Sequence, residues 1–534
     1  MTATADRQAS VMAASLLAVL LGLASCALLL WVSLKPSLAG INSDAAVYVL
    51  LADWLSPWQS SDIGFGARLF EHYPFPPLYP LLLAALGAGS SNPLMAYGAD
   101  AVLQALAVAA SGWWAQRAGF DRASVMLAAL SLALTPIALF TAMGLFSEPL
   151  YLALSMSALA VLAGPEHKIR HWYVAAVLLG LAALTRGVGL FAVAALLLVW
   201  AWRTRMHSAR LTPLLALAAP LLWMALKAAQ GWQGSYTHNL FGGDTLAVLH
   251  GLLEQLPTNL RALHYHFVRC FDSLGGRHSA VLLSLLLVPA TFTWIQRLRA
   301  AELDACYAAL YVGVIVLWPY PNHFARFLLV LLPLFAAYAS HGTVGLLRAL
   351  GQARLARHGA GLTCVLLLLV VAPSVWQVLS TIARADDTQA RLETRISSWY
   401  SHDSRAAAMA STAFSLRVLE VMAELGERLP RDACVSATMA EVFMLHSRRY
   451  SRPPPSQRDD VASLRVALAD CPYVLLLGAT AFPAADFPVF YPAERLPGEL
   501  TALYSVARDP ALPDAPALAI LARYRGPAPP APGH

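Results

Sequence analysis

Charged residues are scarce in this sequence of 534 residues. Asp, Glu, Lys and Arg together make up 13% of it, whereas hydrophobic residues make up 58%. Soluble proteins carry roughly 25% charged residues, and a soluble core could not bury this much apolar surface. The composition therefore excludes an ordinary soluble protein and predicts a chain that crosses a membrane several times.

Motifs for metals and phosphates are also missing. The six cysteines are scattered, without a CxxC pair or metal-ligand spacing. Glycines are spread along the apolar runs, and no glycine-rich phosphate loop follows a predicted strand. The formal charge of +6 is what an excess of Lys and Arg on cytoplasmic loops would produce. It therefore does not indicate a nucleic-acid partner.

Eleven hydrophobic runs are long enough, or nearly long enough, to cross a bilayer. They cover residues 11–33, 93–115, 122–141, 148–163, 171–185, 187–202, 211–229, 279–296, 304–318, 326–341 and 360–380. Several are shorter than the roughly 20 residues of a typical span. We interpret the first run as an uncleaved span rather than a signal peptide. It is long for a signal sequence, and Asp6 stands beside the only basic residue before it, Arg7.

Basic residues orient these spans. The apolar run 77–89 is too short to cross comfortably, and treating it as an interfacial helix places five basic clusters in the cytoplasm. These clusters are Arg117 and Arg122; Lys168 and Arg170; Arg203, Arg205 and Arg210; Arg297 and Arg299; and Arg348, Arg354 and Arg357. The longer outer loops then hold few basic residues. We therefore predict a cytoplasmic N-terminus and an extracytoplasmic C-terminus.

The character of the chain changes after residue 384. The predicted parts are a transmembrane domain at 1–384, with outer loops at 34–92 and 230–278, a soluble α/β domain at 385–525 and a disordered tail at 526–534. In the soluble domain, a helical pattern near 404–428 precedes short β-type runs. Cys434 and Cys471 begin two of these runs. They could pair in an oxidising compartment, but we favour two separate buried thiols.

Two acids lie at the outer membrane face in this topology. Asp44 follows the first span in the segment INSDAAVY, and Glu148 lies in the segment FSEPL. Each could simply follow a helix N-cap, formed by Ser43 or Ser147. However, carboxylates beside hydrocarbon are costly and functional by default, and these two share one face. We therefore predict that Asp44 and Glu148 are catalytic, whereas Asp53, on the opposite side of the same helix, should face solvent.

Two arginines lie at the same face. Arg186 interrupts two short apolar runs in the segment TRGVG, and Arg326 opens a span in the segment PYPNHFARF. Arg186 could be a simple turn residue that extends its charge to the membrane surface. However, positive charge on the outer side departs from the topology trend, and a guanidinium can bind a phosphate through two hydrogen bonds. We therefore predict that both arginines bind a phosphate group.

Aromatic and amide side chains in the outer loops are further candidates. The predicted substrate-binding residues are His72, Tyr73, Tyr79, His238, Asn239 and His323. The first three lie in the segment EHYPFPPLYP, whose four prolines stiffen the entry to the interfacial helix. Rings with polar tips suit the membrane surface, and the tyrosines could equally be anchors of an aromatic belt. A lone histidine in a loop most often faces solvent.

In their order along the chain, these motifs resemble those of the C-type glycosyltransferases (GT-C), in particular the bacterial branches related to protein O-mannosyltransferases and lipid A aminoarabinose transferases. The matching pieces are Ser43-Asp44, His72-Tyr73-Pro74, Pro76 to Pro80, Ser147-Glu148-Pro149, Leu184-Thr185-Arg186, and Arg326-Phe327 before Leu331-Leu332-Pro333. They cover the first two-thirds of the chain. The resemblance implies a polytopic α-helical GT-C-like fold, with about eleven transmembrane helices plus interfacial helices, and a small C-terminal α/β domain.

The resemblance also implies an activity. A hexosyl- or pentosyltransferase would move a sugar, with inversion, from a polyprenyl-phosphate donor to a lipid, glycan or protein acceptor. The reaction would take place at the periplasmic face of the bacterial inner membrane. A polytopic transporter, a lipid flippase and a non-catalytic lipid-binding scaffold stay open as alternatives.

Each site residue then has an implied role. Asp44 would act as the base, or would hold hydroxyl groups if the acceptor is itself a phosphate. Glu148 would orient the acceptor, or would bind a metal if one is used. Arg186 and Arg326 would stabilise the departing phosphate. Many relatives have paired acids in the first outer loop or a DxD-type pair in the second, whereas this chain has single acids. We therefore expect no required cofactor, and a divalent metal is doubtful.

Overall fold

The computed structural model describes residues 2–33, 43–58, 66–73, 75–164, 168–204, 209–232, 245–273, 276–318, 324–383, 405–437, 439–453, 460–477, 496, 498–507 and 517–526. The predicted domain boundary at 384/385 and the tail, apart from Gly526, lie outside these residues.

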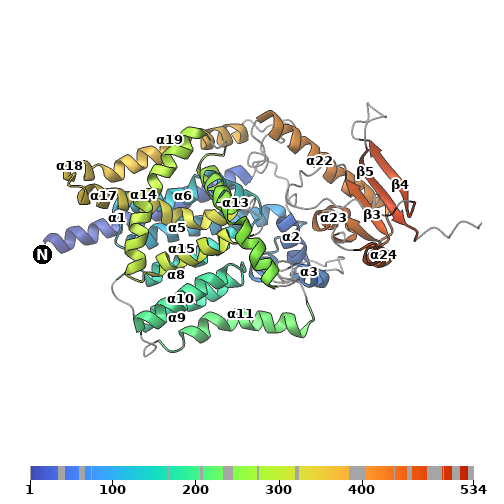
Figure 1. Cartoon of the computed structure of the whole chain (residues 1–534), viewed down its shortest axis with the longest axis horizontal. Helices are drawn as coiled ribbons and strands as arrows, with labels where there is room; N and C mark the ends of the chain where they lie inside the picture. Colours follow the sequence, from blue (N-terminus) through green and yellow to red (C-terminus); the bar gives the residue numbers. More distant parts are fainter. Residues whose placement is uncertain are drawn as a thin grey trace, which may run out of the picture.

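Apolar helices build the main body of the molecule (Figure 1). They are α1 (Thr2–Ser33), α5 (Pro93–Arg117), α6 (Arg122–Ala133), α7 (Pro136–Met143), α8 (Glu148–Leu162), α9 (Ile169–Ala183), α10 (Gly189–Thr204), α11 (Thr212–Ala229), α14 (Arg277–Arg299), α15 (Leu303–Val316), α16 (Phe324–Leu328), the 3-10 turn η2 (Leu329–Leu331), α17 (Leu332–Ala349), α18 (Ala353–Ala356) and α19 (Gly359–Ala383). Each hydrophobic run that the sequence predicts to cross the membrane is helical here.

Helix lengths divide these elements into two groups. Among the described residues, five helices are at least 18 residues long and apolar enough to cross a bilayer, and the bent pair α6 and α7 makes a sixth. Shorter apolar helices include α8 and α9, with 15 residues each. A helix of that length is about 22 Å long, less than the roughly 30 Å of the hydrocarbon core. Their ends can therefore lie below the membrane surface. The chain is a multi-pass membrane protein.

Four further helices complete the described part of the body. They are α2 (Ser43–Leu55), α3 (Gly66–His72), α4 (Leu78–Ala85) and the long α13 (Thr245–Phe271). α4 lies in the run 77–89 and, with only 8 residues, is too short to cross a bilayer. Its first amide, Leu78 N–H, donates to Leu184 C=O at 2.9 Å. This bond ties α4 to the turn that carries Arg186.

The C-terminal part is a small α/β unit. It contains α22 (Arg405–Arg428), β1 (Cys434–Ala437), α23 (Ala440–Ser447), β2 (Tyr450–Arg452), α24 (Val461–Asp470), β3 (Tyr473–Leu477), β4 (Leu500–Ala507) and β5 (Ala517–Tyr524). The strand order is β2-β1-β3-β5-β4, parallel for the first three strands and antiparallel for the last pairings. The sheet was predicted from its apolar runs; β2, α23 and α24 were not.

One apolar core joins this unit to the outer helices. Buried side chains of α2 and α4 pack in the same cluster as those of α22, α23, β1 and β3. Residues 45–53 of α2 are all buried, although α2 lies outside the spans. The C-terminal unit therefore rests directly on one end of the helical body (Figure 1).

The prediction of two separate thiols is wrong, because Cys434 and Cys471 form a disulfide. The reason is topological. β1 and β3 are adjacent and parallel, with Val435 paired to Tyr473. The residues at the start of both strands therefore lie side by side, although they are 37 positions apart. The spacing of the two cysteines in the sequence does not reveal that the two strands are neighbours.

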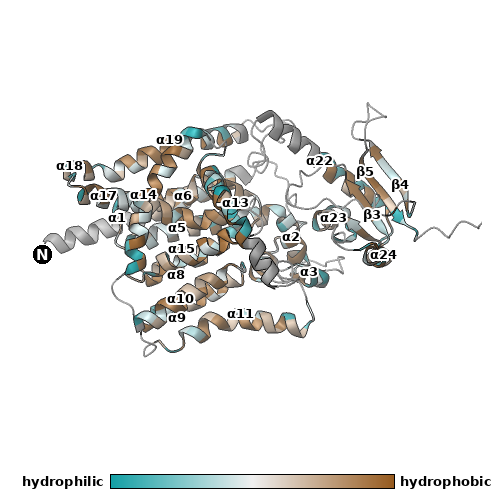
Figure 2. Ribbon diagram, viewed as in Figure 1, coloured by the Kyte–Doolittle hydropathy of each residue, from teal (hydrophilic) through white to brown (hydrophobic). Residues whose placement is uncertain are grey.

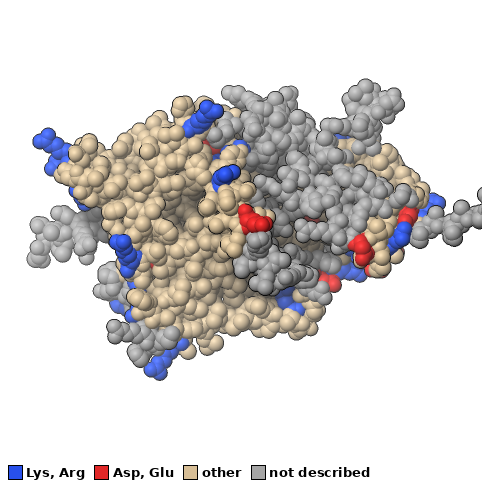
Figure 3. Space-filling model, viewed as in Figure 1, with Lys and Arg blue, Asp and Glu red and all other residues tan. Residues whose placement is uncertain are grey.

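Hydropathy and charge differ between the helical body and the C-terminal unit. Figure 2 shows apolar residues over most of the helical body and a mixed surface on the C-terminal unit. In Figure 3, Lys and Arg side chains stand along the edge of the body that lies away from the C-terminal unit, and further ones lie on the middle of the body and on the C-terminal unit, beside acids.

We expect the double substitution Cys434→Ser and Cys471→Ser to lower the stability of the C-terminal unit. Losing a native disulfide typically costs about 2–4 kcal/mol, which thermal unfolding followed by intrinsic fluorescence would report. Cys306→Ser, at a free cysteine of α15, is the control. Equal unfolding temperatures for the wild type and the double variant would contradict the pairing.

Candidate active site

Asp44 lies in the first turn of α2, the helix that packs against α23 of the C-terminal unit. Its side chain is 26% exposed, whereas the residues that follow it in the helix are buried. An acid in the first turn interacts favourably with the helix dipole. Asp44 nevertheless has a specific partner, which is Arg326.

Glu148 begins α8 after a tight turn. Leu145 has a left-handed φ of 54°, and a side chain at Gly144 would collide with the ring of Phe146. Ser147 holds the N-cap position, but its side chain makes no capping bond. Its Oγ instead lies 3.0 Å from the hydroxyl of Tyr48 on α2. Capping by Ser147 therefore does not explain this motif, and Glu148 is completely buried.

Arg326 joins the two acids. Its Nη1 donates to Asp44 Oδ2 at 2.7 Å, and its Nε donates to Glu148 Oε1 at 2.8 Å. The guanidinium carbon lies 3.8 Å from the centre of the Phe146 ring, a cation–π contact. Arg326 is on the short helix α16, so residues 282 and 178 positions apart in the sequence meet there.

Arg186 completes the cluster. It lies in the turn between α9 and α10, which is so tight that a side chain at Gly189 would collide with the backbone of Ala183. Arg186 Nη1 lies 2.5 Å from Glu148 Oε1. Glu148 Oε1 therefore serves both arginines, whereas its Oε2 is buried and has no hydrogen-bond partner among the described residues.

The structure thus brings together all four charged residues that the sequence singles out. We refer to Asp44, Glu148, Arg186 and Arg326 as the charge cluster. Two acids balance two bases, and Asp44 is the most exposed member, at 26% against 16%, 11% and 0% for Arg326, Arg186 and Glu148. An incoming anion would therefore displace Asp44 more easily than Glu148.

A second buried carboxylate lies behind the cluster and was missed from the sequence. Asp100 on α5 is fully buried and accepts a hydrogen bond of 2.8 Å from the Tyr79 hydroxyl. Tyr79 is also fully buried, and its ring meets that of Tyr48 edge-on at 4.8 Å. A carboxylate inside a membrane span is costly, and this signal could have identified Asp100. The role of Tyr79 in substrate binding stays a prediction.

Tyr73 connects the body to the C-terminal unit. Its hydroxyl donates to Glu441 Oε2, on α23, at 2.5 Å. Burial, followed by the charge of Glu441, raises the pKa of Tyr73 well above 10, so the phenol stays protonated and acts as donor. Burial also raises the pKa of Glu441, and the charge of Asp44 raises it further.

Other predicted residues are placed differently. The expectation for Asp53 is wrong. It is only 4% exposed, and it accepts a hydrogen bond from the Ser90 amide at 2.9 Å. α4 and α23 pack against α2, and residues 45–53 of α2 are all buried. His72 ends α3, but its side chain lies outside the described residues.

The remaining predicted substrate-binding residues lie in segments that the structure does not describe. They are His238, Asn239 and His323. Within the described segments, no three His, Cys, Asp or Glu side chains are grouped closely enough to hold a metal ion.

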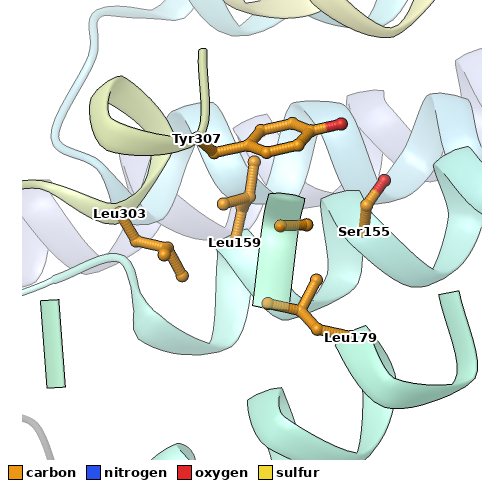
Figure 4. A pocket seen from close by; sticks show the side chains of 6 residues that line it. Ser155, Leu159, Leu179, Leu303 and Tyr307 are labelled. Atoms are coloured by element: carbon orange, nitrogen blue, oxygen red, sulfur yellow. The ribbon is translucent and has the colours of Figure 1, made fainter. Parts of the chain in front are cut away.

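A small pocket lies apart from the charge cluster, between α8, α9, α10 and α15 (Figure 4). Its lining residues are Ser155, Leu159, Leu179, Ala192, Leu303 and Tyr307. Both hydroxyls already have partners on Tyr151: Tyr307 bonds its hydroxyl at 2.8 Å, and Ser155 donates to its carbonyl at 2.8 Å. No charged residue lines the pocket, so we assign it to helix packing.

Removing Glu148 should destabilise the protein far more than removing Asp44. Glu148→Ala leaves two arginines without their buried partner, which typically costs about 3–5 kcal/mol. Asp44→Ala removes one partly exposed partner, and about 1 kcal/mol or less is expected. Thermal unfolding of both variants in the same detergent would measure the difference, and similar losses would argue against a shared, buried Glu148.

The sequence matches no protein-family model and no curated protein. The crystal structure of ArnT from Cupriavidus metallidurans bound to undecaprenyl phosphate is similar, with a TM-score of 0.52 and 14% identity over 94% of this chain and 97% of that chain. The Archaeoglobus fulgidus oligosaccharyltransferase matches with a TM-score of 0.46 and 12% identity, over 85% of this chain and 69% of that chain. The arabinofuranosyltransferase AftD from Mycobacteria matches with a TM-score of 0.42 and 15% identity, over 97% of this chain and 40% of that chain. The likeness to ArnT covers both chains almost completely, so this chain has the fold of the GT-C membrane glycosyltransferases, as its motifs predict.

Proposed function

We propose that this protein is a membrane glycosyltransferase that moves a sugar from a polyprenyl-phosphate donor to an acceptor at the outer membrane face. One observation carries the proposal: Arg326 is shared between a partly exposed acid, Asp44, and a buried acid, Glu148. A GT-C fold with this cluster at the outer end of an apolar body offers groups for a phosphate, a hydroxyl and a lipid tail together.

The chemistry assigns one role to each group. The acceptor oxygen bonds to the anomeric carbon of the sugar while the bond from that carbon to the phosphate oxygen breaks. Asp44 takes the acceptor proton, and Arg326 and Arg186 stabilise the negative charge on the departing phosphate. Attack opposite the leaving group inverts the anomeric centre. Glu148 holds both arginines, and its Oε2 is available to a sugar or acceptor hydroxyl.

A lipid donor fits the position of the cluster. Glu148 begins α8, and Arg186 follows shortly after α9. Both helices are short, so these residues can lie below the membrane surface. A prenyl tail can remain among apolar helices while its phosphate reaches the arginines. Nucleotide sugars are cytosolic and would not reach an outer-facing site. In the similar ArnT structure, undecaprenyl phosphate is the bound lipid.

The proposed location is the bacterial inner membrane, with the N-terminus in the cytoplasm and the C-terminal unit in the periplasm. Basic side chains at the far edge of the body support this orientation (Figure 3). The disulfide between Cys434 and Cys471 suits an oxidising compartment. The acceptor would be a lipid, a glycan or a protein.

Asp44→Asn should abolish transfer without unfolding the protein. Losing a general base typically lowers the rate about 10²–10⁴-fold. The assay uses protein in nanodiscs, a panel of undecaprenyl-phosphate-linked radiolabelled sugars and the inner-membrane fraction of the source organism as acceptor. The matched control is Glu302→Gln, because Glu302 is equally exposed, at 27%, and pairs with Arg203 at 2.9 Å near the opposite end. Full activity of Asp44→Asn would remove Asp44 from the mechanism.

The same assay tests the alternatives. A transporter or flippase would move labelled lipid between leaflets without a glycosylated product. A non-catalytic scaffold would bind the lipid and transfer nothing.

Donor binding should respond in opposite directions to the loss of Arg326 and to the loss of its partner Asp44. Arg326→Ala should weaken binding of undecaprenyl phosphate about 10–100-fold, the loss expected for charged hydrogen bonds. Asp44→Asn should tighten it about two- to fivefold, because the phosphate no longer competes with a partly exposed ion pair. Native mass spectrometry of nanodisc-embedded protein would measure both affinities. Tighter binding in Arg326→Ala, or weaker binding in Asp44→Asn, would contradict the proposed phosphate site.

A further inference from the structure

Glu441 is a buried acid that the mechanism so far does not use. It lies in the first turn of α23, is 5% exposed and belongs to the C-terminal unit. α23 packs against α2, the helix that carries Asp44. A buried carboxylate is costly unless it has a specific partner, and its partner here is Tyr73 of the first outer loop.

Tyr73 leads from Glu441 toward the charge cluster through a series of rings. Its ring stacks on Phe75, with centres 6.0 Å apart and planes within 2°. Phe75 contacts the ring of Tyr48 at 5.2 Å, and Tyr48 bonds Ser147, the residue before Glu148. Both Tyr73 and Phe75 are partly exposed. Asp44 is near enough for its charge to act on Glu441.

The local backbone also favours a defined position for Glu441. Met439, just before α23, adopts a left-handed φ of 58°, which is uncommon for a residue with a side chain. The turn places Glu441 at the N-terminal end of α23, where the helix dipole favours an acid. On the other side of the contact, Pro76 and Pro77 follow Phe75 and restrict the chain that carries the rings.

We propose that Glu441 is a positioning residue for the acceptor. It acts through Tyr73, whose phenol it holds so that the Tyr73–Phe75 pair forms one wall of the acceptor site beside Asp44. The acceptor class that fits is a polyhydroxylated group, such as a sugar or a glycolipid headgroup. Its apolar face would lie on the rings, and its hydroxyl would reach the Asp44 carboxylate. The inference rests on the proposed glycosyltransferase activity and assigns the acceptor side to the C-terminal unit.

The test uses Glu441→Ala, Glu441→Gln, Tyr73→Phe and the double variant Tyr73→Phe with Glu441→Ala in the nanodisc transfer assay. Glu441→Ala and Tyr73→Phe should each raise the apparent acceptor KM about tenfold. The apparent donor KM and the affinity for undecaprenyl phosphate should not change. The double variant should be no worse than the more impaired single variant, because both changes remove one hydrogen bond. Glu441→Gln can still accept that hydrogen bond, so its apparent acceptor KM should stay close to the wild-type value.

The matched control is Glu499→Ala. Glu499 is also buried in the C-terminal unit, and its partner there is Arg465, at 2.5 Å. Its loss should lower the stability of the unit without changing the acceptor KM. Hydrogen–deuterium exchange adds a readout that is independent of activity: Glu441→Ala should increase exchange in residues 66–79, whereas Glu499→Ala should not.

The outcomes separate the two proposals. A wild-type protein that transfers no sugar would overturn the glycosyltransferase assignment, and the acceptor role of Glu441 with it. An active wild type with unchanged acceptor KM in Glu441→Ala would overturn only the positioning role. So would additive effects of Tyr73→Phe and Glu441→Ala, or equal losses in donor and acceptor KM.

Discussion

Two guanidinium groups share one carboxylate oxygen, Glu148 Oε1, and the outer end of the molecule is arranged around this contact. Burying two cations next to hydrocarbon is unfavourable unless an acid neutralises them in good geometry. Three separate chain segments must therefore meet at Glu148: the turn after α7, the turn between α9 and α10, and α16. Asp44 supplies the second negative charge and remains the member that solvent reaches most easily.

Both the helical body and the C-terminal unit contribute to the surroundings of the charge cluster. The body provides an apolar environment in which the cluster is strong, because charged interactions weaken in water. The C-terminal unit covers α2 and α4 and shares one apolar core with them. The helix that carries Asp44 is thereby buried outside the spans, which explains why Asp53 is buried as well. In addition to this apolar packing, Glu441 of the C-terminal unit accepts a hydrogen bond from Tyr73 of the body.

Much of this arrangement could be predicted from local patterns. Spans follow from runs of apolar residues, and their orientation follows from the positions of Lys and Arg. The sequence singled out four charged residues because a charge beside a hydrophobic run is energetically costly and is therefore expected to have a function. They are Asp44, Glu148, Arg186 and Arg326. Asp100 carried the same signal inside a span. Glu441 had no such sequence signal, because acids are common in helices of soluble domains. Only the contact with Tyr73 distinguishes it. The pairing of Cys434 with Cys471 depended on strand adjacency.

The sequence by itself determined the membrane class, the helical body, the four charges beside hydrophobic runs and the resemblance to GT-C enzymes. These properties follow from composition and from spacing along one segment. Only the tertiary structure decided which charges meet, that Glu148 is shared and buried while Asp44 is partly exposed, and that Tyr73 bonds Glu441 across 368 positions. Such contacts depend on how distant helices pack, and packing is a property of the whole fold rather than of any local pattern.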